Sequence, residues 1–196
     1  ACFRGLGLDD LLHAPADSGI ALRGGRAMLT AGFERAGWQD MAEVDRQYPV
    51  LLQAYATDIA TLTVFYPGAL AAVANLRQAG YVVSICTNKP EGLAVQLMAA
   101  LGATEAFDAL VGADTLPVRK PDPAPLWEAV DRAGGDRGRV CLIGDTLTDR
   151  TTAANADVAS VLVTFGPGGG DMAALDPAAL LHDFADLPKL VAQLIG

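Results

Sequence analysis

Basic residues are scarce in this chain. Its 14 lysines and arginines stand against 23 aspartates and glutamates, which gives a formal net charge of −9 at pH 7. A protein that binds nucleic acid without sequence preference needs a basic face for the phosphates. The sequence therefore disfavours nucleic-acid partners. It stays compatible with small anionic substrates, because a local cationic pocket can lie in an acidic protein.

Cysteines and long hydrophobic runs are also few. The three cysteines form no CxxC pair, and Cys86 and Cys141 lie in apolar, strand-like runs, where cysteine acts as a small hydrophobe. Together with a beginning that does not resemble a secretory leader, this predicts a reduced, cytoplasmic protein. Because no apolar run approaches the roughly 20 residues of a membrane-spanning helix, we expect no membrane partner.

The first third of the chain has a helical pattern. The 196 residues are 52% hydrophobic, which is enough for one full core or for a core with a small cap. Apolar residues recur at helical spacing over residues 2–12, 26–36 and 41–60, and the first strand candidate comes only after them. This pattern predicts an all-helical cap domain over residues 1–63.

The pattern changes after Tyr66-Pro67-Gly68, because Pro-Gly is a strong turn signal. From there strand-like runs alternate with helical patterns, which is typical of parallel βαβ units. We expect an α/β core over residues 64–196 with a doubly wound, mainly parallel, Rossmann-like sheet. The predicted strands are residues 81–86, 109–112, 140–143 and 159–164. The predicted helices are residues 69–79, 90–101, 123–133, 148–156 and 187–195, and a flexible glycine-rich loop is predicted at 166–170.

Two of the predicted strands end in polar residues that suit an anion. Thr87 and Asn88 precede a helix, whose first backbone N–H groups and dipole attract negative charge. Lys120 lies in the segment RKPDP, where the prolines fix the backbone and the ammonium can face a phosphate. Each residue also has a plainer interpretation. Thr87 or Asn88 could simply cap the helix, and Lys120 could be a solvated lysine at a helix start.

A third strand ends in Gly144-Asp145, and Asp149 follows four positions later. Ligands of open α/β sheets collect at the carboxyl ends of the strands, and Mg²⁺ favours oxygen ligands alongside substrate phosphates. Asp145 is therefore a candidate metal ligand. Asp149 is a candidate ligand, or an acceptor that orients Lys120 or metal-bound water. Alternatively, both acids only interact with a helix dipole.

In order and spacing, these three segments resemble the haloacid dehalogenase superfamily of phosphatases. Thr87 matches its second motif, Lys120 its third, and GDTLTD at residues 144–149 its fourth. TNKP at residues 87–90, RKPDP and the preceding helical cap look most like the phosphoglycolate phosphatase branch. The resemblance covers essentially the whole chain. At Asp157 the family usually has glycine, so we expect an altered turn there.

The resemblance implies a Mg²⁺-dependent phosphomonoester hydrolase that works through an aspartyl-phosphate. It implies a small phosphorylated metabolite as substrate, 2-phosphoglycolate above all. Thr87 and Lys120 then have catalytic roles and bind phosphate together with the Asn88 amide, while Asp145 holds part of the metal. We expect a monomer or a homodimer.

Three basic residues are candidates for substrate specificity. Arg23 and Arg26 flank a glycine pair in the cap, and two arginines can bind a small carboxylate bidentately. Lys89 is the third candidate. The plainer interpretation of all three is a solvated surface.

The first motif of the superfamily, DxDxT, has no match, because the sequence contains no Asp-x-Asp. By the resemblance, the segment with the nucleophile and the general acid–base is absent, and we expect this chain to be inactive by itself. Three explanations stay open: a sequence that starts late through cloning or processing, a shortened pseudoenzyme, and a rearrangement with swapped chains.

Alternative functions also stay open. One group comprises other phosphatases, pyrophosphatases and phosphoglucomutases of the same superfamily. Another is a non-catalytic module that binds phosphate or metal. A dehalogenase is disfavoured, because that chemistry does not need a metal acid such as Asp145. A dinucleotide-binding domain is disfavoured, because no GxGxxG follows a first strand.

Overall fold

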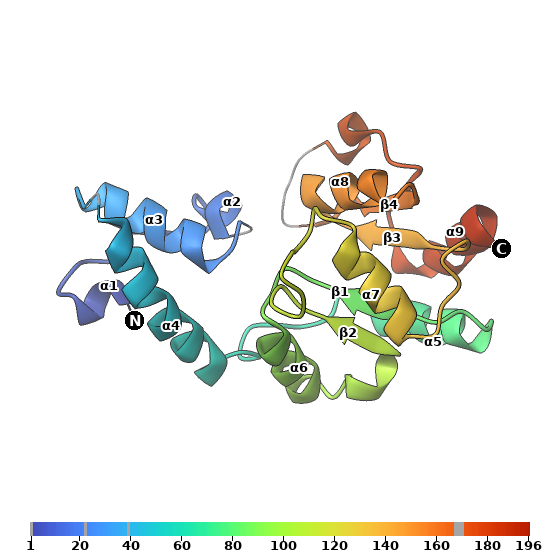
Figure 1. Cartoon of the computed structure of the whole chain (residues 1–196), viewed down its shortest axis with the longest axis horizontal. Helices are drawn as coiled ribbons and strands as arrows, with labels where there is room; N and C mark the ends of the chain where they lie inside the picture. The colour runs from blue at the N-terminus through green and yellow to red at the C-terminus, as the bar shows by residue number, and fades with distance from the viewer. Residues whose placement is uncertain (1, 22, 39, 167–170) are drawn as a thin grey trace. The chain divides into compact units, whose positions relative to one another are not determined.

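The computed structural model describes residues 2–21, 23–38, 40–166 and 171–196. The chain divides into two compact units, Ala1–Thr61 and Leu62–Gly196 (Figure 1). The described part of the first unit contains helices and no strand, and all described strands lie in the second. Of the glycine-rich loop predicted at residues 166–170, all but Gly166 lies outside the described residues.

The first unit contains α1 (Cys2–Gly5), α2 (Ser18–Ala21), α3 (Gly25–Arg35) and α4 (Met41–Thr57). Its core is a cluster of buried side chains from α1, α3 and α4: Cys2, Leu29, Phe33 and Val44. The first turn of α4 is fixed by Asp40, whose carboxylate accepts from the Ala42 amide. Helical spacing thus predicts α3 and α4, since α3 buries Leu29 and Phe33 and α4 packs Val44, with the partly buried Tyr48 and Leu51, against them.

The helix predicted over residues 2–12 is wrong beyond Gly5. The chain turns back after α1, and the amides of Leu6 and Leu8 both donate to the Phe3 carbonyl oxygen. Gly7 has φ of 74°, a left-handed conformation that glycine adopts without steric cost. Leu6 and Leu8 pack on the core of the unit although the helix has ended, which explains why the leucine spacing resembles that of a helix.

The second unit alternates strands and helices. Its strands are β1 (Ser84–Cys86), β2 (Ala109–Val111), β3 (Cys141–Gly144), β4 (Ala159–Val163) and β5 (Ala179–Leu181). Its α-helices are α5 (Ala69–Gln78), α6 (Glu91–Ala100), α7 (Ala124–Arg132), α8 (Leu147–Asn155) and α9 (Leu187–Ile195). Short 3₁₀ turns are η1 (Thr104–Ala106), η2 (Met172–Leu175) and η3 (Phe184–Asp186).

All described strand pairs are parallel, as the alternating pattern predicts, but they form two sheets. One pairs β1 with β2, and the other has the order β3-β4-β5. Within the second sheet β4 is central and buried at four of its five positions. Figure 1 shows β1 and β3 pointing the same way, so their carboxyl ends lie on one side of the unit.

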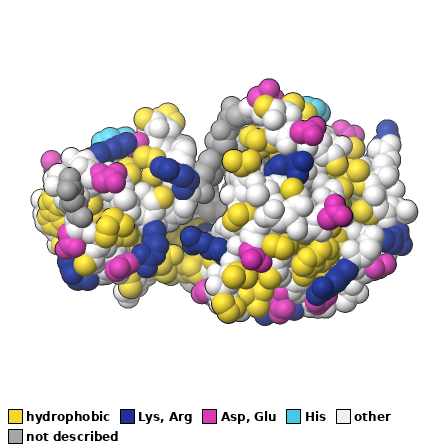
Figure 2. All heavy atoms as spheres, turned by 45° about the horizontal axis from the view of Figure 1, so that its top comes forward, with side chains coloured by type: hydrophobic (Ala, Val, Ile, Leu, Met, Phe, Trp, Pro, Cys, Tyr) yellow, Lys and Arg dark blue, Asp and Glu magenta, His cyan; other side chains and the backbone are white. Residues whose placement is uncertain are grey.

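Apolar helix faces cover these sheets. A core cluster joins Leu76 of α5 and Val191 of α9 to Val161 and Leu181 of the larger sheet. On α7, Leu126 and Val130 are buried, as expected for an amphipathic helix. Acidic and basic side chains are interspersed over the face that Figure 2 shows. Across the described ranges, the structure contains no helix with the length and apolar character to span a membrane.

Candidate functional site

Lys120 is the centre of a polar cluster at the carboxyl ends of β1 and β3. Its Nζ donates to Asp149 Oδ1 at 2.7 Å and to the Cys86 carbonyl oxygen at 2.8 Å. The Lys120 and Asp149 side chains are only 10% and 9% exposed. Cys86 ends β1, and Asp149 lies in the first turn of α8, directly after β3. One ammonium therefore connects the ends of the two sheets, and its third N–H is suited to a further acceptor.

The loop that carries Lys120 is held by two asparagine side chains. Asn88 Nδ2 donates to the Lys120 carbonyl oxygen at 3.0 Å, and Asn155 Nδ2 donates to the Pro121 carbonyl oxygen at 2.9 Å. The sequence predicts that the Asn88 amide binds phosphate. In the structure, the Asn88 side chain positions the loop that carries Lys120. Asn155 was not predicted, since only the fold brings the end of α8 against this loop.

Asp149 is fixed through its second oxygen. Oδ2 accepts from Thr146 Oγ1 at 2.6 Å and from the amides of Asp145 and Thr146, both at 3.2 Å. Thr146 Oγ1 in turn accepts from the Asp149 amide, which completes a capping box at the start of α8. Thr146 also was not predicted, although its spacing to Asp149 is a readable capping-box pattern.

Gly144 allows this close packing. A Cβ on Gly144 would lie 2.3 Å from Asp149 Cβ, which excludes any other residue without movement of α8. Burial acts to raise the pKa of Asp149, but the Lys120 charge and the hydrogen bonds from Lys120 and Thr146 outweigh it, so this pKa lies below its usual value. Asp149 is therefore a charged acceptor that orients Lys120.

The pKa of Asp145 is shifted in the opposite direction from that of Asp149. Burial first, and then the negative charge of Asp149, raise the pKa of Asp145, while Lys120 opposes them. A nearby cation would compensate this charge. Among the described residues, no group of three or more His, Cys, Asp or Glu side chains could hold a metal ion. A single carboxylate still fits Mg²⁺, which commonly takes one or two protein carboxylates together with substrate phosphates and waters.

Thr87 lies beside this cluster, between two residues that contact Lys120. Its amide donates to the Val111 carbonyl oxygen at 2.9 Å and extends the β1–β2 ladder. Its Oγ1 accepts from the Lys89 amide at 3.1 Å, which leaves the hydroxyl proton for donation to an anion. The structure thus brings Thr87, Asn88, Lys120, Asp145 and Asp149 together in the second unit.

The predicted specificity residues are divided between the units. Lys89 is half-buried in the second unit, and Arg23 is exposed after α2 in the first. Arg26 forms an ion pair with Asp45, and its guanidinium carbon lies 4.6 Å from the centre of the Tyr48 ring. Within the first unit, Arg26 is thus already engaged.

The similarity to known proteins identifies the family. Residues 29–163 match the haloacid dehalogenase-like hydrolases. The chain belongs to this family. Two curated relatives of this hydrolase are named phosphoglycolate phosphatase. The one from Mesorhizobium japonicum is 38% identical over 200 aligned positions, which cover 95% of this chain and 87% of the relative. The one from Agrobacterium fabrum is 35% identical over 190 positions, which cover 96% and 79%.

A solved structure shows the same fold. The crystal structure of a predicted phosphoglycolate phosphatase from Haemophilus somnus superimposes on this hydrolase with a TM-score of 0.82 at 22% identity. The likeness covers 96% of this chain and 86% of the other. It confirms the expected α/β architecture with a helical cap.

Proposed function

We propose that this hydrolase serves the hydrolysis of a phosphomonoester, with 2-phosphoglycolate as its substrate. The observation that carries the proposal is the buried Lys120 ammonium, which Asp149 and the Cys86 carbonyl hold at the joined ends of β1 and β3. Such a fixed cation beside the Thr87 hydroxyl is suited to the oxygens of a phosphoryl group. The names of the relatives support phosphoglycolate as the particular ester.

Each residue then has a distinct task. Lys120 donates its remaining N–H to a phosphate oxygen, and Thr87 donates its hydroxyl proton to another. Asp149 holds the Lys120 ammonium in place. Asp145 would hold Mg²⁺, which when bound supplies positive charge to the phosphate oxygens. Lys89 is the candidate of this unit for contact with the substrate carboxylate, and the roles predicted for Arg23 and Arg26 of the helical unit stay predictions.

The nucleophile of the proposed reaction is an aspartate that forms an aspartyl-phosphate, and the sequence contains no Asp-x-Asp pair to supply it. We therefore expect the chain of the printed sequence to show no Mg²⁺-dependent hydrolysis of p-nitrophenyl phosphate. Measurable turnover by purified chain, absent from a Lys120→Met preparation, would contradict this expectation.

The substrate proposal needs a chain with the nucleophile restored. A DxDxT-bearing segment would be fused before residue 1, and the same fusion with asparagine at its first aspartate is the matched control. We expect hydrolysis of 2-phosphoglycolate by the first fusion only, with a loss of kcat/KM on the order of 100-fold for Lys120→Met. Activity confined to other phosphate esters would refute phosphoglycolate as the substrate.

A non-catalytic binding function is the second candidate, and the missing Asp-x-Asp pair is the observation that favours it. In that case orthophosphate would bind to the unmodified chain and Lys120→Met would abolish the binding. The experiment with the DxDxT-bearing fusion separates the two candidates, because a binding module would stay inactive on every phosphate ester after fusion.

A further inference from the structure

The turn between β1 and α6 is held by the loop that follows β2. Pro90 lies within this turn and has no N–H, so the backbone groups that flank it are the Lys89 carbonyl oxygen and the Glu91 amide. The Ala113 amide donates to the Lys89 carbonyl oxygen at 2.9 Å, and the Glu91 amide donates to Asp114 Oδ1 at 2.7 Å. Two consecutive residues of one loop therefore hold the turn on both sides of its proline.

Gly112 permits the close approach of this loop to α6. A Cβ on Gly112 would lie 2.3 Å from the Glu91 nitrogen, so a larger residue would force the loop and the helix apart. Thr115 Oγ1 accepts from the Gly112 amide at 2.8 Å and donates to Glu91 Oε2 at 2.6 Å, while the Arg132 guanidinium donates to Glu91 Oε1 at 3.0 Å. The start of α6 thus has a fixed place against the end of β2.

Asp114 acts as a cap for α6 from a distant segment. The residue before the helix is Pro90, whose side chain forms no capping hydrogen bond, and Asp114 supplies an acceptor from 23 positions beyond Glu91. A carboxylate at a helix start satisfies an N–H group that has no partner within the helix, and it interacts favourably with the helix dipole. Of the N–H groups that the sequence predicts to attract an anion, the first in the helix is therefore occupied by the protein's own carboxylate.

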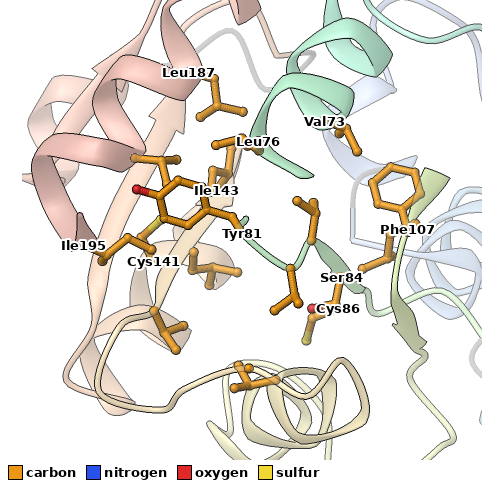
Figure 3. Close-up of a pocket in the computed structure, with 18 of the residues that line it drawn as sticks. Val73, Leu76, Tyr81, Ser84, Cys86, Phe107, Cys141, Ile143, Leu187 and Ile195 are labelled. Atoms are coloured by element: carbon orange, nitrogen blue, oxygen red, sulfur yellow. The ribbon is translucent and has the colours of Figure 1, made fainter. Parts of the chain in front are cut away.

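The contacts of this loop extend to the hydroxyl of Thr87. The Lys89 amide donates to Thr87 Oγ1 at 3.1 Å, while the carbonyl oxygen of Lys89 accepts from the loop, so a shift of the Lys89 backbone would turn the hydroxyl. The strand before Thr87 gives limited support. Its three residues are only half-buried and line an apolar cavity of about 630 Å³, and Figure 3 shows Ser84 and Cys86 among the lining residues. The position of Thr87 therefore depends on the contacts beyond the end of β1.

We propose that Asp114 is a positioning residue for phosphate binding. By holding the Glu91 amide, it fixes the turn of residues 87–91, so that the Thr87 hydroxyl and the Asn88 amide face the same phosphoryl group as Lys120. The inference rests on the proposed function, which places a phosphate at these groups. Asp114 is exposed and negatively charged, and its charge by itself repels a phosphate. A positioning role and a purely electrostatic role therefore predict opposite effects when the side chain is removed.

The test measures binding of orthophosphate to the full chain by calorimetry in the presence of Mg²⁺. Asp114→Ala removes both the charge and the acceptor, whereas Asp114→Asn removes the charge but keeps an oxygen for the Glu91 amide. We expect affinity at least about fivefold lower for Asp114→Ala, because a helix-start acceptor is lost, and within about twofold of the native value for Asp114→Asn. Asp136→Ala is the matched control and should not change the affinity. Asp136 Oδ1 also accepts a backbone N–H, that of Gly138 at 2.8 Å, but it lies before β3, at the opposite end of the strand from the site.

Amide exchange with water, measured by NMR without phosphate, follows the turn itself. The Glu91 amide should exchange at least about fivefold faster in Asp114→Ala than in the native chain, while the Leu162 amide of β4 stays unchanged and shows that the unit remains folded. Faster Glu91 exchange with unchanged phosphate affinity would overturn the proposal, because the contact would then be structural only.

Two other results of the binding measurement would also overturn the proposal. Tighter binding by both Asp114 variants would leave only charge repulsion, and an equal loss in both would mean that the charge matters and the acceptor does not. These outcomes leave the proposed function intact. If the native chain bound no orthophosphate at high millimolar concentration, the proposed function would fail and the positioning role with it.

Discussion

At the scale of single residues, the Lys120–Asp149 ion pair differs from the surface ion pairs by its burial. Both side chains are almost fully buried, so each charge depends on the other for compensation. The exposed Arg132–Glu128 pair has a similar distance, 2.7 Å, but its side chains are 39% and 34% exposed. The two pairs have the same distance, but we expect the exposed pair to contribute less to stability, because water screens it.

Asp149→Asn should lower the free energy of unfolding by about 3 kcal/mol, since it removes the counter-charge that is hydrogen-bonded to the buried Lys120 ammonium. Urea unfolding followed by far-UV circular dichroism measures this change. Glu128→Gln is the matched control, and we expect no measurable effect from it. If both variants lost the same stability, the buried pair would have no special role.

Cys141 gives the chain an alkaline limit of stability. Burial raises the pKa of its thiol to about 11, against about 8.5 for an unfolded cysteine. The folded pKa is the higher one, so the stability is fully present below about pH 8.5 and is lost as the pH rises through about 11. We expect a loss on the order of 2 kcal/mol across this window, measured by urea unfolding at each pH.

Cys141→Ala tests the assignment of this pH dependence. The variant loses some packing at every pH, but the difference between it and the native chain should shrink between pH 8.5 and 11. A difference that stays constant across the window would show that another group causes the alkaline loss.

Part of the site could be predicted from residue types and spacing alone. Thr87, Lys120, Asp145 and Asp149 each follow a predicted strand, and the fold brings such ends together. The engagement of Asp149 Oδ2 by Thr146 was readable from the capping-box spacing. The contact of Asn155 with the Pro121 carbonyl was not, because it depends on how α8 packs against a distant loop.

At the scale of elements, the turn between α8 and β4 is unusual. Asp157 has φ of 54°, and the Val158 amide donates to the Ala153 carbonyl oxygen at 3.0 Å, which closes a Schellman-type helix end. Glycine is the residue that this left-handed position favours. The sequence predicts an altered turn at Asp157, but in the structure the aspartate adopts the left-handed conformation of a glycine and the turn itself is not altered.

Asp157→Gly should raise the free energy of unfolding by up to about 1 kcal/mol, because it removes the steric cost of the left-handed conformation. Thermal unfolding by calorimetry gives the measurement. Asp157→Ala is the matched control and should give no gain, since it removes the same charge but keeps a Cβ. Equal stabilisation by both variants would indicate that charge removal is the cause.

The long periodic helices were predictable, whereas the short strands gave a mixed outcome: β2 was predicted and β5 was not. The core-facing apolar residues of α3 and α4 and the apolar runs of β3 and β4 correspond to their sequence patterns. In contrast, β5 consists of Ala179, Leu180 and Leu181, which favour a helix at least as much as a strand, and its pairing with β4 determines its structure. The error over residues 2–12 has the same origin, because tertiary packing outweighed helical spacing.

At the scale of the whole molecule, the division of the α/β unit into two sheets should produce unequal local stability. The β1–β2 sheet consists of two short strands that are not fully buried. A two-stranded sheet is only marginally stable unless other elements cover it. The β3–β4–β5 sheet has a central strand with buried residues at four of five positions. The smaller sheet should therefore open before the unit as a whole unfolds.

Native-state hydrogen exchange tests this expectation. The Thr87 amide, which donates to the Val111 carbonyl oxygen, should exchange at least about tenfold faster than the Leu162 amide of β4 after correction for intrinsic rates. The Leu162 amide lies within β4, and the Thr87 amide continues the β1–β2 ladder. The comparison therefore reports the opening of each sheet. Equal opening free energies for the two amides would mean that both sheets unfold as one cooperative unit.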